Sequence, residues 1–176
     1  MDVTDLFDRA NNTDLGANWT PQRTNWNLQI VSQRICHRAT TSDYVEQYTA
    51  ATPTNPQFAE ITLAAFTGTA HAQFAAVTRM GATGTNGNAQ DYYYGAAMRN
   101  DAYYGPGFTS MIIEATNNSE TVIASESSTT WVAGDVVKLV SNGNAHTLYR
   151  NGASLITNSS DSAHTSGGVG VYVYSE

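Results

Sequence analysis

Short runs of alternating apolar and polar residues, separated by clusters of Gly, Asn, Ser and Thr, constrain the fold of this chain most strongly. In residues 57–63, for example, Ala59, Ile61 and Leu63 alternate with larger or more polar neighbours. Successive side chains of a strand point to opposite faces of a sheet, so this period of two predicts a strand whose Ile61 face points inward. Helical periodicity is nearly absent. The pattern therefore favours an antiparallel sandwich over an alternation of strands and helices.

The same alternation predicts further strands along the whole chain. They are expected at residues 44–51, 74–80, 92–98, 108–115, 121–127, 136–141, 146–150, 154–157 and 169–174, with one more containing Trp26, Leu28 and Ile30. Asn142-Gly143 and Asn151-Gly152 are expected to form type I′ turns, which need positive φ angles at both central residues. With the opening segment, these strands predict an all-β protein, a two-sheet antiparallel jelly-roll sandwich with almost no helix. We expect a single domain over residues 1–176, large enough to bury roughly 70% of its unfolded surface.

Two signatures at opposite ends of the chain accompany this pattern. The first is the stretch from Asp5 to Thr20, DLFDRANNTDLGANWT, and the second comprises Leu148 to Gly152 (LYRNG), Asp161 and the stretch Ser166 to Tyr172 (SGGVGVY). Together they resemble the concanavalin A-like, laminin G-like jelly-roll modules, in which a D-x-F-x-R-A opening and a final glycine-rich strand bracket one sandwich. Gln57 to Leu63, Val77 to Arg79 and Trp131 to Asp135 fit the middle of such a module.

This resemblance implies roles for several residues. Trp19 and Trp131 are expected to be structural anchors of the sandwich. The first and last strands are expected to pair with each other, since such pairing would remove an exposed sheet edge. Modules of this kind occur in virion proteins of tailed phages, in glycan-binding domains and in some glycoside hydrolases, so the resemblance says more about fold than about function.

Composition excludes several classes of partner. The net charge is −7, and Lys138 is the one lysine, so the chain lacks the clustered cations with which proteins neutralise nucleic-acid phosphates. We expect no nucleic-acid partner. No basic and apolar leader opens the sequence, and no run approaches the ~20 apolar residues of a membrane span. Cytoplasmic synthesis without a signal peptide and no membrane insertion are therefore expected. The single cysteine, Cys36, excludes an intramolecular disulfide.

Catalytic patterns are missing from the sequence. Glucanases of the resembling fold carry two carboxylates on one strand face, but Glu60 has no such partner, and we name Glu114 and Glu120 only as residues to test. There is no G-x-S-x-G motif, and the four histidines lie in unrelated segments, where we expect them at the surface or at strand ends. We therefore expect no enzymatic activity.

The segment from Gly81 to Gly107 is the best candidate for a contact surface, because it holds five of the ten tyrosines among Gly and Asn. Tyrosine offers a large contact area at low entropic cost and a hydroxyl for a polar partner. In a strand, Tyr92 and Tyr94 would share one face and Tyr93 would take the other, so at least one of the three is expected in the core. The candidate partner or glycan contacts are Asp91, Tyr92, Tyr93, Tyr94, Arg99, Asn100, Asp101, Tyr103 and Tyr104. No cofactor is expected, although calcium on Asp91, Asn100 and Asp101 is an open alternative suggested by the resemblance.

Three functions follow from these observations. The resemblance favours a non-catalytic structural virion protein of a tailed phage, above all a capsid decoration protein on the capsid exterior that binds the major capsid protein or other virion subunits. Such a protein is expected to form a homo-oligomer, a trimer by analogy with other decoration proteins. A carbohydrate-binding receptor or adhesion module is the alternative, and a glycoside hydrolase ranks third.

Overall fold

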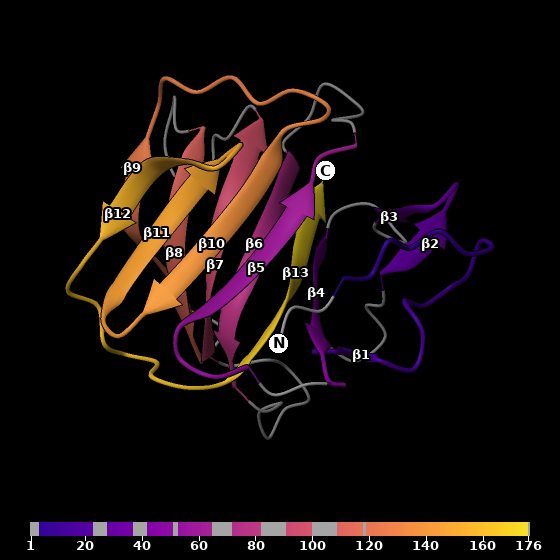
Figure 1. Cartoon of the computed structure of the whole chain (residues 1–176), viewed down its shortest axis with the longest axis horizontal. Helices are drawn as coiled ribbons and strands as arrows, with labels where there is room; N and C mark the ends of the chain where they lie inside the picture. Colours follow the sequence, from indigo (N-terminus) through magenta and orange to yellow (C-terminus); the bar gives the residue numbers. More distant parts are fainter. Residues whose placement is uncertain are drawn as a thin grey trace.

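The computed structural model describes residues 4–22, 28–36, 42–50, 53–64, 72–81, 91–99, 109–117 and 119–175, and these form thirteen strands without a helix (Figure 1). The strands are β1 Trp19–Pro21, β2 Gln29–Val31, β3 Arg34–Cys36, β4 Ser42–Tyr48, β5 Gln57–Thr62, β6 Ala72–Met80, β7 Asp91–Arg99, β8 Ser110–Thr116, β9 Ser119–Glu126, β10 Val136–Asn142, β11 Ala145–Arg150, β12 Ala153–Asn158 and β13 Gly168–Ser175. No helix capable of crossing a membrane occurs within these ranges.

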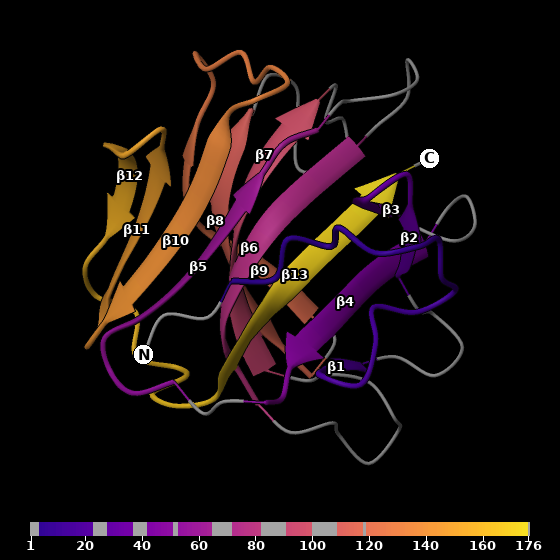
Figure 2. The same cartoon turned by 45° about the vertical axis from the view of Figure 1, so that its right-hand side comes forward.

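The strands form two packed sheets and a hairpin. The larger sheet has the order β1-β4-β13-β6-β7-β8-β9, the smaller sheet has the order β12-β11-β10-β5, and β2 pairs with β3. Every paired neighbour is antiparallel. The four-stranded sheet covers one face of the larger sheet, as Figures 1 and 2 show from two directions. The predicted all-β antiparallel sandwich is confirmed.

The core between the sheets follows the predicted alternation. Leu139 and Leu148 of the smaller sheet pack against Ala76 and Ile112 of the larger one, and all four are fully buried. Ala59 and Ile61 also face this core, as predicted. The sheets are in close contact at Gly95, where an added Cβ would lie 2.6 Å from Leu148 Cδ1. The absence of a side chain there lets the two layers close.

The opposite face of the larger sheet is also buried. Tyr92 and Tyr94 lie there with Tyr172 of β13, and the rings of Tyr94 and Tyr172 stack with their centroids 4.7 Å apart. Tyr93 points to the other face, into the core between the sheets. The predicted division of the three tyrosines between two faces is confirmed, but all three are core residues.

The opening motif forms an internally bonded unit rather than a strand. Both terminal nitrogens of Arg9 donate to the carboxylate of Asp5, and Trp19 Nε1 donates to Asp5 Oδ2 at 2.9 Å. The Trp19 ring also contacts Phe7 and Tyr48, so its predicted anchoring role is confirmed. Trp131, the other predicted anchor, is buried between the sheets.

The predicted pairing of the first and last strands is wrong. β13 lies between β4 and β6, and β1 pairs with the far side of β4 (Figure 2). The first and last strands, β1 and β13, therefore lie in one sheet with β4 between them. The C-terminal strand is an interior strand with a partner on each side.

One of the two Asn-Gly turns differs from the prediction. Asn151 and Gly152 have φ angles of 50° and 80°, as a type I′ turn requires. In the other hairpin Asn142 still belongs to β10, and of the central residues Gly143 and Asn144 only Gly143 has a positive φ, of 56°. Glycine at the first central position is the signature of a type II′ turn.

Candidate functional site

The connection between β12 and β13 crosses one end of the sandwich, along the lower edge of Figure 1. We call residues 159–167 the strap. Its sequence, rich in Ser and Thr, forms no strand or helix. Asn158, the last residue of β12, forms a turn that leads into the strap. Its Oδ1 accepts hydrogen bonds from the backbone N of Ser160 at 3.0 Å and of Asp161 at 3.1 Å. From there on, side chains of the sandwich hold the strap in place.

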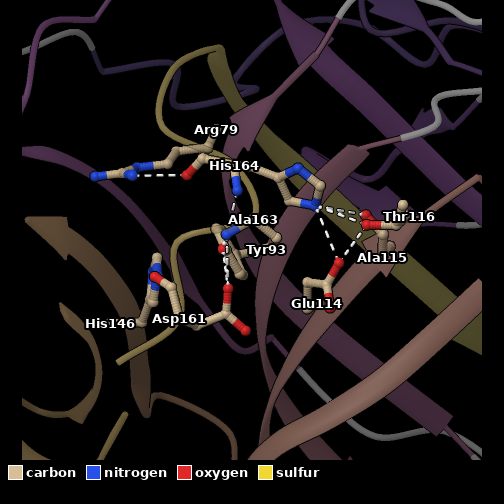
Figure 3. A network of polar contacts seen from close by, with 9 residues as sticks. All are labelled: Arg79, Tyr93, Glu114, Ala115, Thr116, His146, Asp161, Ala163 and His164. Atoms are coloured by element: carbon tan, nitrogen blue, oxygen red, sulfur yellow. Dashed lines mark hydrogen bonds and ion pairs between the residues drawn. The ribbon is translucent and has the colours of Figure 1, made fainter. Parts of the chain in front are cut away.

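Tyr93 is the central anchor of the strap (Figure 3). Its hydroxyl donates to Asp161 Oδ1 at 2.5 Å and accepts the backbone N–H of His164 at 3.1 Å. Burial, reinforced by the bond to the Asp161 carboxylate, raises the pKa of the Tyr93 phenol far above its usual range. The phenol therefore keeps its proton and remains a donor to Asp161.

His146 anchors the strap from the smaller sheet. Its Nε2 lies 3.2 Å from the backbone O of Asp161, and a carbonyl only accepts, so Nε2 carries the hydrogen. In the neutral ring Nδ1 then accepts from Ser141 Oγ at 2.9 Å, and Thr78 Oγ1 donates to Ser141 at 2.6 Å. The imidazole is fully buried against Tyr93, with ring centroids 3.9 Å apart. Burial lowers the pKa of His146.

His164, within the strap, reaches back to β8. Its Nε2 lies 2.9 Å from the backbone O of Ala115, 3.1 Å from Thr116 Oγ1 and 3.4 Å from Glu114 Oε1. The Thr116 hydroxyl donates its one hydrogen to Glu114, so His164 Nε2–H is the donor to Ala115 and Thr116. The same Glu114 carboxylate lies at ion-pair distance from this ring.

Arg79 fixes the strap from β6. It is the extra residue of a β-bulge against β13, with a φ of 53° that is unusual for a bulky side chain. Only 1% exposed, it donates through Nη1 to the backbone O of His164 at 2.7 Å and through Nη2 to Asn55 Oδ1 at 3.2 Å. Gln57 accepts the backbone N–H of Arg79 and donates to the O of Gly167, so β5 holds the end of the strap.

These contacts join several side chains into one network, which we call the strap cluster: Thr78, Arg79, Tyr93, Glu114, Ser141, His146, Asp161 and His164. Ser141 and His146 lie at hydrogen-bond distance, but both are fully buried and their bonds run to Thr78 and to the strap. A substrate carbonyl has no approach to such a serine. Of the histidines expected at the surface or at strand ends, His146 lies near the start of β11 and His164 in the strap, and both are buried. His37 and His71 lie outside the described residues. His146 and His164 flank the same tyrosine, with ring centroids 3.9 and 5.1 Å from that of Tyr93.

The structure separates the predicted contact residues. Tyr92, Tyr93 and Tyr94 are at most 3% exposed, so they are corrected from surface contacts to core residues, because both faces of the larger sheet are covered. Asp91 begins β7 and Arg99 ends it, which places them about 26 Å apart along the strand. Asn100, Asp101, Tyr103 and Tyr104 lie outside the described residues.

The same separation bears on the calcium alternative. Asp91 lies at the strap end of β7, whereas Asn100 directly follows Arg99 at the opposite end. One ion with ligand distances near 2.4 Å cannot bridge the length of a strand. Within the described ranges, no group of three His, Cys, Asp or Glu side chains is arranged to hold a metal.

Near the opposite end of the sandwich, the carboxylates of Glu126 and Asp135 stabilise the fold. Glu126 accepts bonds from Ser110 Oγ, the backbone N of Ser128 and Thr129, and the Ser128 hydroxyl, and these bonds outweigh burial and lower its pKa to about 2. Asp135 is bound to Arg150 at 2.7 Å and to Asn151. Both side chains stabilise turns next to Trp131.

No protein-family model and no curated protein sequence matches the chain. Among solved structures, it is similar to the carbohydrate-binding module CBM66 from Bacillus subtilis, with a TM-score of 0.68 and 15% identity over 92% of this chain and 91% of that one. It is also similar to the carbohydrate recognition domain of Emp46p in its metal-free form, with a TM-score of 0.57 and 11% identity over 90% of this chain and 81% of that one. The potassium-bound form of that domain matches with a TM-score of 0.55 at the same identity. These likenesses identify the fold as a lectin-like jelly roll.

Proposed function

We propose that this protein is a carbohydrate-binding module without catalytic activity. The observation that carries the proposal is the correspondence with CBM66, which extends over nine-tenths of both chains and therefore includes the whole sandwich rather than one motif. A second carbohydrate recognition domain matches over a similar share of this chain. The sandwich is common to proteins with many tasks, so the proposal needs a direct binding test.

The carboxylates that the structure describes support a non-catalytic role. Glu60 is ion-paired with Lys138 on the outer face of the smaller sheet, and Glu114 is engaged by Thr116 and His164 in the strap cluster. Glycoside hydrolysis needs an acid and a second carboxylate facing each other across one glycosidic bond. Glu60 and Glu114 lie in different sheets, so they do not make up such a pair.

We place the glycan contact at the Arg99 end of β7, on Tyr103 and Tyr104 with Asn100 and Asp101. The sequence supports this placement, since tyrosine rings can stack on a sugar ring, while Asn and Asp bind its hydroxyls. The burial of Tyr92, Tyr93 and Tyr94 supports it indirectly, because those three rings are already engaged in the core. The groups of the strap cluster are likewise occupied with one another.

The capsid-decoration hypothesis receives less support than its alternative. The structures reported above are a carbohydrate-binding module and a carbohydrate recognition domain, and neither carries an indication of a phage origin or of a capsid partner. Nothing in the fold favours a trimer over a monomer. The comparisons thus support the carbohydrate-binding function over the virion role.

A glycan array followed by titration tests this proposal. We expect saturable binding to at least one carbohydrate class, weakened roughly tenfold or more by Tyr103→Ala or Tyr104→Ala, as is usual for a truncated aromatic anchor. Tyr149→Ala is the matched control, since Tyr149 lies half-exposed on the outer face of the smaller sheet. Equal loss in all three variants would contradict the placement of the site. Absence of binding to any glycan at millimolar concentration would overturn the function.

A further inference from the structure

The strap is held almost entirely by side chains that project from the body of the sandwich. Its fixed points are the bonds of Tyr93 to Asp161 and to the N–H of His164, of His146 to the O of Asp161, and of Arg79 to the O of His164 (Figure 3). No ladder of backbone hydrogen bonds supports residues 159–167, because they belong to no strand. Together with the bonds of His164 to β8 and of Gln57 to Gly167, these bonds depend on the charge and hydrogen positions of side chains.

His146 is the fixed point most sensitive to a change of charge. It is fully buried, and the cation Arg79 lies close enough on β6 to disfavour a second positive charge. None of the described carboxylates forms an ion pair with Arg79, which donates to the neutral oxygens of His164 and Asn55. The Nε of Arg79 has no hydrogen-bond partner at all within the described part of the chain. The guanidinium of Arg79 is thus buried without an ion-pair partner among the described residues.

The remaining titratable groups around His146 are a phenol, two carboxylates and a second imidazole. The Tyr93 phenol on β7 is neutral and donates to Asp161. Asp161 in the strap is negative and attracts a protonated His146, whereas Arg79 and His164 oppose the protonation of His146. Glu114 on β8 lies beside His164 rather than His146. Burial is the largest of these effects, so a charged imidazole at position 146 would lack the water that stabilises it.

We propose that the strap is a pH-sensitive latch, which opens when His146 takes up a proton. Opening lets water reach the charged imidazole, which restores the hydration that burial removes. In the closed state the neutral ring accepts from Ser141 and donates to Asp161, an arrangement with no place for a second ring hydrogen unless Ser141 and Thr78 reverse their bonds. The latch does not depend on the glycan-binding proposal.

His164 is not the trigger, for a geometric reason. Its Nε2 already lies 3.4 Å from Glu114 Oε1, so a carboxylate stands at ion-pair distance from this ring within the closed strap. The ring nitrogens of His146 contact only the Ser141 hydroxyl and the backbone O of Asp161.

The sign of the effect follows from the linkage between protonation and opening. In the closed strap the pKa of His146 lies below 6.5, whereas in the open strap it returns toward that ordinary value. The population of the closed state is therefore highest above about pH 6.5 and decreases as the pH falls. If one proton drives opening, the opening equilibrium rises by up to about tenfold per pH unit, until the pH falls below the pKa of the closed state.

Amide hydrogen exchange at pH 7.5, 6.5 and 5.5 tests the latch. Protection factors of the N–H groups of Ala163 and His164 should fall by about fivefold between pH 6.5 and 5.5. The amides of Leu63 and Asn151, which donate to Asp135 and Val136 at the opposite end of the sandwich, serve as internal controls and should not change. His146→Gln retains an N–H donor for the O of Asp161 without a titrating ring and should abolish the fall. His164→Gln should leave it in place.

Several outcomes would overturn the proposal. They are protection factors that stay constant with pH, a fall of equal size in His146→Gln, or an equal fall at Leu63 and Asn151, which would report global unfolding. If His146→Gln does not fold, the imidazole of the unaltered protein can be titrated directly by NMR. An ordinary pKa near 6.5 with the strap amides still protected would refute the latch.

Discussion

At the scale of single residues, Glu46 is a carboxyl group whose ionisation is opposed by burial. Its carboxyl on β4 is 1% exposed, and Oε1 accepts the backbone N–H of Leu28 at 2.6 Å. Burial raises the pKa of Glu46 to about 7, against the lowering effect of the Leu28 bond. A proton therefore resides on this side chain in the folded protein at pH values where an unfolded glutamate is ionised.

Glu46→Gln should stabilise the protein increasingly as the pH rises from about 4.5 through 7. The raised pKa means that the contribution of Glu46 to stability is complete below about pH 4.5 and is lost as the pH rises through 7, by roughly 3 kcal/mol. Gln keeps an acceptor for Leu28 and cannot ionise. We expect equal free energies of unfolding for variant and wild type at pH 4.5, and a more stable variant at pH 8, measured by denaturant titration. The exposed Glu60→Gln should show no comparable change, and a pH-independent difference for Glu46→Gln would contradict its titration.

At the scale of elements, the spacing of the two sheets depends on Gly95 of β7. A Cβ there would lie 2.6 Å from Leu148 Cδ1 and 3.2 Å from Leu139 Cβ, both in the facing sheet. Strand β7 lies in the interior of the larger sheet and cannot shift without breaking pairs with β6 and β8. A single methyl group added at Gly95 therefore disturbs the packing of both sheets.

Gly95→Ala should destabilise the sandwich by about 1–3 kcal/mol through overpacking. Leu148→Ala alone should also destabilise it, by about 2–5 kcal/mol, because it leaves a cavity. In the double variant the new methyl group partly fills that cavity, so the combined loss should be clearly smaller than the sum of the two. Gly81→Ala is the matched control, since its Cβ would have only ordinary contacts at 3.5 Å. Additive losses in the double-mutant cycle would contradict direct packing of Gly95 on Leu148.

Elements with a regular side-chain period were predictable from the sequence, whereas those fixed by tertiary contacts were not. The predicted strands from residue 57 to the C-terminus correspond to β5 to β13, with ends that differ by a few residues. The β2–β3 hairpin was missed because its turn residues, Ser32 and Gln33, have positive φ angles without the Gly or Asn that usually indicate such a turn. Tyr92 and Tyr94 were assigned to the surface because alternation does not reveal a sheet that is buried on both faces.

The strap cluster was invisible for a related reason. Arg79, His146 and His164 come from two strands and one connection, and the sequence contains no local motif that joins them. The one usable signal was the register of the β10–β11 hairpin, which places Ser141 directly opposite His146. Recognising that pair required the correct turn, and the turn at Gly143 differs from the predicted type.

At the scale of the whole molecule, the sandwich has two ends with different properties. The strap end gathers two histidines, Arg79 and Tyr93 in a network bonded to itself. At the opposite end, the described turns are held by Asp135 and Glu126, and β7 leads into the segment that we propose for glycan contact. A division between a pH-sensitive end and a binding end is what the account predicts for the molecule.

Chemical-shift mapping of the isotope-labelled protein, titrated with the best carbohydrate from the array, tests this account most directly. Saturable shifts are predicted for Met98, Arg99 and the residues that follow them, with the strap amides of Ala163 and His164 unchanged at pH 7.5. Saturable shifts confined to the strap would place the site at the wrong end. The absence of shifts with every carbohydrate tested would contradict the central claim that this sandwich is a carbohydrate-binding module.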